Sequence, residues 1–492
     1  MAEATGRRGP RQRSAQRPAE RGRTADGPRR AAYTLLRDVD GGAYANLELP
    51  KILRDLRLDG RDAAFATELA YGAVRWQGRY DPMIAIAAAR ELTAIDPSVL
   101  STLRLGAHQI LGMRVPAHAA VAETVALARQ VNGAGAAGFV NAVLRRLSER
   151  ALDEWLEAAS ATIRDPLARL AVTESHPVWI VKAVRAALLG HGDATPDTVD
   201  DALAEALSAN NTPARVSLVA RPGWATVAEL VSAGAEPGRW AETAATMAGG
   251  DPGAIRAVRE GRAAVQDEGS QLVTLALVHA PVDAIGEQRQ ERWLDLCAGP
   301  GGKAGLLAAL AMERGASLVA NDVSEHRADL VRKTLRPAIH SGIPGQVQVW
   351  VGDGREVGRD HPAAFDRVVV DAPCTGLGAL RRRPESRWRK QPSDVTQLAT
   401  LQRELLSSAL EAVRPGGVVA YVTCSPHLVE TRFAVTDVVK KRSDVELLDA
   451  RPLVVDHAGQ ALLDVGVGPF VQLWPHRHGT DAMFLALLRR TS

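Results

Sequence analysis

Two of the three cysteines in this 492-residue chain directly follow strand-like segments. Cys374 ends the run 368–374, and Cys424 ends the run 418–424. A free cysteine is most often a small buried hydrophobic residue, but a thiolate in a polar turn near cations is a nucleophile. Zinc binding is disfavoured because the cysteines are scattered and form no Cys-x-x-Cys pair. The two thiols therefore indicate covalent chemistry on an electrophilic ring.

A glycine-rich loop, residues 297–303, precedes both thiols in the chain and opens a helical run. It is not a P-loop, because Cys297 and Ala304 stand where that motif requires Gly and Ser or Thr. Such a loop can be a simple strand-to-helix turn, but its glycines also let the backbone approach a ligand, and the helix N-terminus favours a negative group. Asp322 and Asp353 come at the ends of the next two strand-like runs, where a carboxylate can hold ribose hydroxyls. These features favour S-adenosylmethionine, with its carboxylate at the loop, its ribose at Asp322 and its adenine near Asp353.

A thiol beside S-adenosylmethionine suits methylation of cytosine at C5. This carbon is a poor nucleophile, and addition of a thiolate to C6 moves electron density to C5, which then attacks the methyl group. Asp371 lies three residues before Cys374. We expect it to hydrogen-bond the N3/N4 edge of the ring and to stabilise the adduct. The alternative for Asp371 is a turn-forming role before a proline.

Short β-rich runs alternate with helical runs from about residue 265. Such alternation predicts a parallel sheet covered by helices on both faces. Right-handed crossovers place the carboxyl ends of parallel strands at one edge, where ligands of such sheets bind. We therefore expect the glycine loop, the carboxylates and the thiols to meet at this edge. The predicted strands are Trp293–Cys297, Ser317–Asp322, Val347–Val351, Arg367–Asp371 and Val418–Thr423, and the predicted helices are Leu306–Met312, Arg327–Leu335 and Val395–Val413.

The chain before residue 265 divides into three stretches of different composition. Residues 1–30 carry nine Arg against three acidic residues, so we expect a disordered tail, either merely solvated or a loose phosphate-binding arm. Apolar residues recur at helical spacing through residues 31–165, which predicts an all-α domain. Residues 166–264 mix helical runs with one strand-like run and predict a small α/β connecting subdomain. Residues 265–492 form the predicted catalytic domain.

The overall composition is that of a globular protein, with 46% hydrophobic and 24% charged residues. No apolar stretch is long enough to cross a bilayer, so we expect no membrane partner. Three cysteines do not make a disulfide scaffold. Free thiols imply a reducing compartment, and we expect a cytoplasmic monomer.

A basic run, residues 381–390, follows Cys374 closely and surrounds one tryptophan with cations. Charge runs are usually solvated surface, but this one is adjacent to the thiols. Cations around an aromatic ring suit phosphate contacts combined with base stacking, which favours RNA as the partner. The predicted RNA-binding residues are Arg381, Arg382, Arg383, Arg387 and Trp388.

With these residues together, the chain resembles the RNA cytosine-5 methyltransferase family. Its N-terminal region is similar to NusB-like RNA-binding domains, notably at 61–79 and 138–147. That pairing of domains is similar to the arrangement of bacterial methyltransferases of small-subunit (16S) ribosomal RNA. The stretches that carry the resemblance are Cys297–Lys303, Asp371–Cys374 with its basic continuation, Thr423–Ser425, Val265–Asp267 and Pro475–Asp481.

The resemblance implies a multidomain protein with an all-α NusB-like domain and an α/β Rossmann-like class I methyltransferase domain. It also implies that Cys424 is the nucleophile and that Cys374 assists release of the methylated product. Gly299 and Ala304 depart from the commoner Ala and Thr of the family loop. A transfer-RNA cytosine methyltransferase and a non-catalytic RNA-binding or antitermination factor stay open as alternatives. The implied cofactor pocket, with no metal, comprises Cys297, Ala298, Gly299, Pro300, Gly301, Gly302, Lys303, Asp322, Asp353 and Asp371.

Overall fold

The computed structural model describes residues 25–284, 289–341 and 343–492. The chain forms two compact units, one ending at Ile163 and the other beginning at Arg164. Most of the predicted basic tail, residues 1–24, lies outside the described residues. The prediction of disorder is wrong for residues 27–30, because they form the first turn of helix α2 (Gly27–Asp40). Arg29 is buried in this turn and donates to the Gln109 side chain at 2.8 Å.

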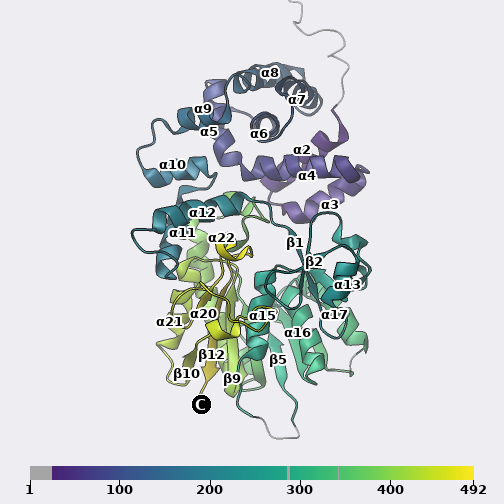
Figure 1. Ribbon diagram of the computed structural model, residues 1–492, viewed down its shortest axis with the longest axis vertical. Helices are drawn as coiled ribbons and strands as arrows, with labels where there is room; N and C mark the ends of the chain where they lie inside the picture. Colours follow the sequence, from purple (N-terminus) through teal and green to yellow (C-terminus); the bar gives the residue numbers. More distant parts are fainter. Residues whose placement is uncertain (1–24, 285–288, 342) are drawn as a thin grey trace, which may run out of the picture. The chain divides into compact units, whose positions relative to one another are not determined.

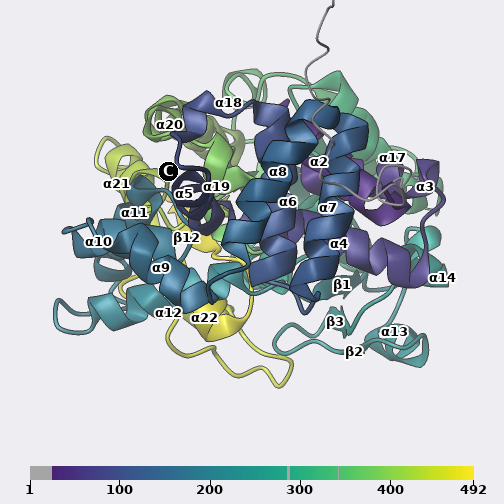
Figure 2. The same cartoon turned by 90° about the horizontal axis from the view of Figure 1, so that it is seen from above.

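The first unit is built from helices, as the periodicity predicts. Its core gathers side chains from successive helices, among them Met83, Leu103, Val125 and Leu144. Figure 2 shows α6, α7 and α8 side by side. Asp96 begins α6 by accepting a hydrogen bond from the Ser98 backbone N–H at 2.8 Å, which satisfies a free donor of the first turn. The helices after α2 are α3 (Ala45–Asp55), α4 (Gly60–Arg75), α5 (Gln77–Ala88), α6 (Pro97–Leu111), α7 (Ala117–Val131), α8 (Ala134–Leu147) and α9 (Leu152–Ser160).

The predicted connecting subdomain, residues 166–264, is not a separate compact unit. Its helices α10 (Pro166–Thr173), α11 (Val178–Gly190) and α12 (Val199–Asn211) share a core with Leu377, Leu380 and Trp474 of the catalytic region. The remainder forms an antiparallel sheet in the order β2-β3-β1-β4 with a small core of its own. Its elements are β1 (Val216–Ala220), α13 (Val227–Ser232), β2 (Glu236–Pro237), β3 (Ala244–Met247), α14 (Arg256–Arg259) and β4 (Ala263–Val265).

The main sheet has the strand order β10-β12-β9-β8-β5-β6-β7, with β11 paired to β12. Strands β5 to β9 pair in parallel, and the five predicted strands correspond to them. At one edge the sheet continues with strands that the sequence analysis did not predict, where β12 runs antiparallel to β9 and β10 runs antiparallel to β12. The strands are β5 (Arg292–Asp295), β6 (Ser317–Asp322), β7 (Val347–Val351), β8 (Phe365–Asp371), β9 (Val413–Thr423), β10 (Val445–Leu448), β11 (Val471–Gln472) and β12 (Phe484–Arg490).

Helices cover both faces of this sheet, with α15, α16 and α17 on one side and α20 and α21 on the other (Figure 1). Alternate residues of a strand point to opposite faces, so Val369 packs with the first group while Val368 and Val370 pack with the second. Each such buried side chain contributes about 1.5–3 kcal/mol. The helices are α15 (Glu268–His279), α16 (Gly302–Glu313), α17 (Glu325–Ser341), α18 (Val357–Asp360), α19 (Ser386–Arg389), α20 (Pro392–Ala412), α21 (Arg432–Val439) and α22 (Pro475–His478).

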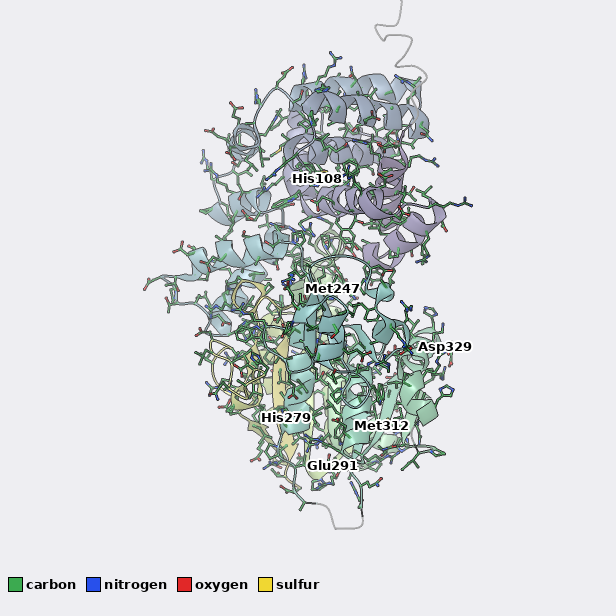
Figure 3. The ribbon with its side chains drawn as sticks, turned by 45° about the vertical axis from the view of Figure 1, so that its right-hand side comes forward. His108, Met247, His279, Glu291, Met312 and Asp329 are labelled. Carbon is green, nitrogen blue, oxygen red and sulfur yellow. The ribbon has the colours of Figure 1, made fainter. Side chains whose placement is uncertain are left out.

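The two ends of the parallel strands differ in their chemistry. Figure 3 labels Glu291, just before β5, at the end where the parallel strands begin, and Met247 of β3 towards the opposite end. Glu291 accepts a hydrogen bond from Arg367 at 2.8 Å, a structural ion pair away from the predicted site.

Among the described residues, no helix is both long and apolar enough to span a bilayer.

Candidate active site

The carboxyl ends of the parallel strands bring the two predicted thiols together. Strand β8 leads into Cys374 and strand β9 leads into Cys424, and their Sγ atoms lie 3.5 Å apart. The hydrogen bond from Cys374 and the charge of Lys303 lower the pKa of Cys424, although burial and the Asp371 charge oppose them. The hydrogen bond to Cys424 and burial raise the pKa of Cys374 well above its usual range. The positive charge of Lys303 thus favours ionisation of Cys424.

Lys303, at the end of the glycine loop, contacts Asp371 at the end of β8. Its Nζ atom lies 2.9 Å from Asp371 Oδ2, and its side chain is only 8% exposed. Burial would lower the pKa of Lys303, but the charge and hydrogen bond of Asp371 raise it above its usual value. The lysine thus stays protonated beside both Asp371 and the Cys424 thiol.

The glycine loop is held against the end of β6. The Gly299 backbone N–H donates to Asp322 Oδ2 at 3.0 Å, and a Cβ at position 299 would lie 2.4 Å from that same oxygen. Gly301 has a φ of +115°, which favours glycine, and a Cβ there would meet the side chain of Thr334 at 2.9 Å. Helix α16 begins at Gly302, so the first-turn N–H groups face the loop.

A carboxyl group that the sequence prediction missed lies beneath this loop. Asp295 ends β5, is fully buried, and neither of its side-chain oxygens has a well-formed hydrogen-bond partner among the described residues. Burial, with the charge of Asp371, raises its pKa to about 8. The sequence feature that could have identified Asp295 as a site residue is its position, two residues before Cys297. A cationic ligand would compensate this buried acid, and S-adenosylmethionine carries positive charge at its amino and sulfonium groups.

The far end of the predicted cofactor pocket is more open. Asp353 follows β7 and forms an ion pair with Arg355 at 2.6 Å, so it is not a free carboxylate. The neighbouring side chains of Val323 and Val351 are 66% and 41% exposed and follow or end β6 and β7. Exposed aliphatic surface beside a carboxylate suits a flat base with polar edges, and the residues at this edge therefore fit a nucleoside-containing cofactor. The contact of Asp353 with adenine stays a prediction.

The basic run predicted to bind RNA is only partly exposed. Arg387 is fully buried and donates to the Ser175 carbonyl at 2.9 Å and to the Asn211 side chain at 2.8 Å. The prediction of RNA binding is therefore wrong for Arg387, because the end of α12 and the loop after α10 surround its guanidinium. Arg383 is exposed and Trp388 is half-buried, and their contacts with RNA stay predictions.

Arg381 and Arg382 begin this run and are tied to buried carboxylates. Arg382 Nε donates to Asp481 Oδ1 at 3.0 Å, and Arg381 donates to Asp267 Oδ2 at 3.2 Å. The Asp481 backbone N–H donates to Asp267 Oδ1 at 3.0 Å, and burial together with the Asp481 charge raises the pKa of Asp267 to about 6. This cluster joins two segments that resemble the family, 265–267 and 475–481. RNA binding by Arg381 and Arg382 stays a prediction.

Replacing Asp322 with alanine is expected to weaken S-adenosylmethionine binding by about 1–3 kcal/mol, roughly 5- to 150-fold in Kd, the scale of a hydrogen bond to a charged group. Asp322 accepts from Gly299 and from the Ser324 backbone N–H at 3.0 Å each, so the change also loosens the loop. Calorimetric titration measures the affinity. Asp329→Ala is a matched control, because this carboxylate on α17 is 55% exposed (Figure 3). Equal affinity in both variants would show that Asp322 does not contribute to cofactor binding.

Comparisons with known proteins agree with this geometry. Residues 282–489 match the model of the family described as 16S rRNA methyltransferase RsmB/F, and residues 27–149 match the NusB family. A protein of Mycobacterium tuberculosis H37Rv, named as a candidate methyltransferase (Rv1407), is 50% identical over 96% of this chain and 99% of its own length. The ribosomal RNA small subunit methyltransferase B of Pseudomonas putida is 32% identical over 83% of this chain and 87% of its own.

A solved structure shares the fold. The crystal structure of PH0851 superposes with a TM-score of 0.75 at 21% identity, covering 94% of this chain and 98% of its own. The predicted fold class is thereby confirmed, with a NusB-like helical domain and a Rossmann-like methyltransferase domain whose sheet is mixed. The chain belongs to the 16S rRNA methyltransferase RsmB/F family and is an S-adenosylmethionine-dependent RNA methyltransferase.

Proposed function

We propose that this enzyme methylates C5 of a cytosine in small-subunit (16S) ribosomal RNA through a covalent Cys424–C6 adduct. The observation that carries the proposal is the pair of thiols, 3.5 Å apart, beside Lys303 and Asp371 at the cofactor edge of the sheet. A methyltransferase acting on an already nucleophilic atom needs no thiol there. Two thiols of unequal pKa suit a reaction that both forms and breaks a sulfur–carbon bond.

The reaction begins with the target base outside its stack, because a stacked base cannot reach the strand ends. The Cys424 thiolate adds to C6, which forms the S–C6 bond, breaks the C5–C6 π bond and places that electron pair on C5. Asp371 hydrogen-bonds the N3/N4 edge and stabilises this adduct. Bound S-adenosylmethionine supplies the methyl group that C5 takes up.

Release of the product reverses the addition. The C5 proton leaves to a base, its electron pair restores the C5–C6 double bond, and the S–C6 bond breaks to return the Cys424 thiolate. Cys374 lies in contact with the departing sulfur and stabilises it through the Sγ–Sγ hydrogen bond. This contact supports the assignment of Cys374 to release, while Cys424, with the lower pKa, is the nucleophile.

Relatives named as ribosomal RNA small subunit methyltransferases and the NusB-family match support ribosomal RNA as the substrate. Bisulfite sequencing of ribosomal and transfer RNA from a deletion strain tests the proposal. We expect one 16S cytosine to lose its 5-methyl mark in the deletion strain and to regain it on complementation. Loss of a mark in transfer RNA alone would establish the alternative substrate, and unchanged cytosines throughout would contradict C5 methylation.

A further inference from the structure

A buried glutamate links the two turns that carry the thiols. Glu430, in the short 3-10 helix η4 (Leu428–Glu430), is fully buried. Its Oε1 accepts from the Thr375 backbone N–H at 2.7 Å, and its Oε2 accepts from the Thr375 hydroxyl at 2.5 Å and the Ser425 hydroxyl at 2.6 Å. Thr375 directly follows Cys374, and Ser425 directly follows Cys424. One carboxylate therefore holds the residue after each thiol.

Glu430 is itself fixed from several directions. Its carbonyl accepts from the Tyr421 hydroxyl at 2.8 Å, and its N–H donates to the His427 carbonyl at 2.9 Å. The Gln402 amide, from α20, donates to the Pro373 carbonyl at 2.8 Å and lies 3.4 Å from Glu430 Oε1. Among residues 25–284, 289–341 and 343–492, no ion pair involves Glu430, so its donors are neutral. Hydrogen bonds to a carboxylate are short and strong, and this set forms a rigid clamp.

We propose that Glu430 is a positioning residue that holds the two thiol turns at the separation required for adduct formation and release. The inference depends on the proposed function, because only that function gives the two thiols different roles. The sheet alone fixes the strands: the last link between β8 and β9 is the Ala372 N–H to the Val422 carbonyl at 2.9 Å. Both thiols lie beyond that link. Glu430 links the two turns through its carboxylate. Two further contacts also join them, one from the Gly378 N–H to the Cys424 carbonyl and one between the Thr375 and Ser425 hydroxyls at 3.3 Å.

The charge of Glu430 also adds to the difference in pKa between the two thiols. The hydrogen bond with Cys424 and burial are the largest causes that raise the pKa of Cys374. The charges of Cys424, Glu430 and Asp371 raise it further. The Tyr421 hydroxyl is a further titratable group near Cys374. Cys424 instead faces Lys303, whose positive charge lowers its pKa, together with Asp371 and Asp481, which raise it. Glu430 thus favours a Cys424 thiolate beside a protonated Cys374.

Two variants distinguish the effect of the hydrogen bonds of Glu430 from the effect of its negative charge. Glu430→Ala removes every hydrogen bond of the carboxylate, and we expect kcat to fall about 100-fold, the effect of a reacting group misplaced by about 1 Å. The KM for S-adenosylmethionine should stay within about twofold, because the glycine loop and Asp322 do not contact Glu430. Glu430→Gln keeps the shape and removes the charge. We expect the pH at which iodoacetamide alkylates Cys374, mapped by mass spectrometry from initial rates, to fall by about one unit.

Glu268 provides the matched control. It is also buried and accepts from the backbone N–H groups of Trp240 and Ala241 at 2.6 and 2.8 Å, but it does not contact the thiol turns. Glu268→Gln should therefore leave the Cys374 alkylation profile unchanged, and Glu268→Ala measures the cost of losing a buried clamp elsewhere. Thermal unfolding of all four variants is measured in parallel.

Specific outcomes overturn the inference. A Glu430→Gln enzyme with wild-type kcat and a wild-type Cys374 profile would do so, even if Glu430→Ala failed to fold. Equal losses in Glu430→Ala and Glu268→Ala, in step with stability, would reduce Glu430 to a structural residue. Failure of the proposed function is distinguishable, because the wild-type enzyme would then form no 5-methylcytosine at all.

Discussion

Replacing Cys424 with alanine is expected to abolish methyl transfer and to prevent any covalent protein–RNA adduct. The change removes the sulfur that adds to C6, and C5 then stays too weak a nucleophile. The other candidate, Cys374, is a poor substitute, because burial and the charges of Glu430 and Asp371, which remain in this variant, raise its pKa. The expected loss is on the order of 10⁴- to 10⁶-fold, the scale found when a catalytic nucleophile is removed. Transfer of labelled methyl groups to RNA measures it.

Binding of S-adenosylmethionine is the internal control for this variant. The Gly299–Asp322 and Lys303–Asp371 contacts do not involve Cys424, so the affinity for the cofactor should be unchanged. A Cys424→Ala enzyme that bound the cofactor normally and retained a tenth or more of the wild-type rate would show that C6 addition by this thiol is not required.

Replacing Cys374 with alanine is expected to give the opposite result, an accumulating adduct. Cys424 still adds to C6 and C5 is still methylated, but the departing thiolate loses its hydrogen-bond partner 3.5 Å away. Release then becomes the slow step. A denaturant-resistant protein–RNA band should build up on gels, and its formation should require S-adenosylmethionine.

The double variant Cys374→Ala with Cys424→Ala is the matched control for that band, and it should form none. If both cysteines were only packing residues, the single variants would be destabilised and neither would give a band. A band from Cys424→Ala, and none from Cys374→Ala, would reverse the two roles.

The sequence alone was sufficient to predict the strands that carry the site. The runs 317–322 and 347–351 are predicted with the bounds observed for β6 and β7. Parallel pairing then places their carboxyl ends at one edge. The glycine loop, Asp322, Asp371 and both thiols follow from that rule, since each lies within a few residues of a strand end.

Contacts between segments that are distant in the sequence could not be predicted from local sequence patterns. Strands β10 and β12 pair antiparallel at the edge of the sheet, and the partners Val445 and Arg490 are far apart in the sequence. Arg387 looks like a solvated cation within a basic run, yet the fold places Ser175 and Asn211 around its guanidinium. A run of charged residues does not show which of them are exposed, because the burial of each one depends on the distant segments that pack against it.

The sequence therefore determined which chemical groups this protein presents, and the tertiary structure decided how they act. Residue types and strand periodicity identified two thiols and a cofactor loop. Only the fold places Cys374 and Cys424 in contact, buries the Asp295 carboxyl group, and brings Glu430 between Thr375 and Ser425. The physical reason is that hydrogen-bond geometry and burial change the pKa and position of a side chain, and both depend on neighbours that no local spacing specifies.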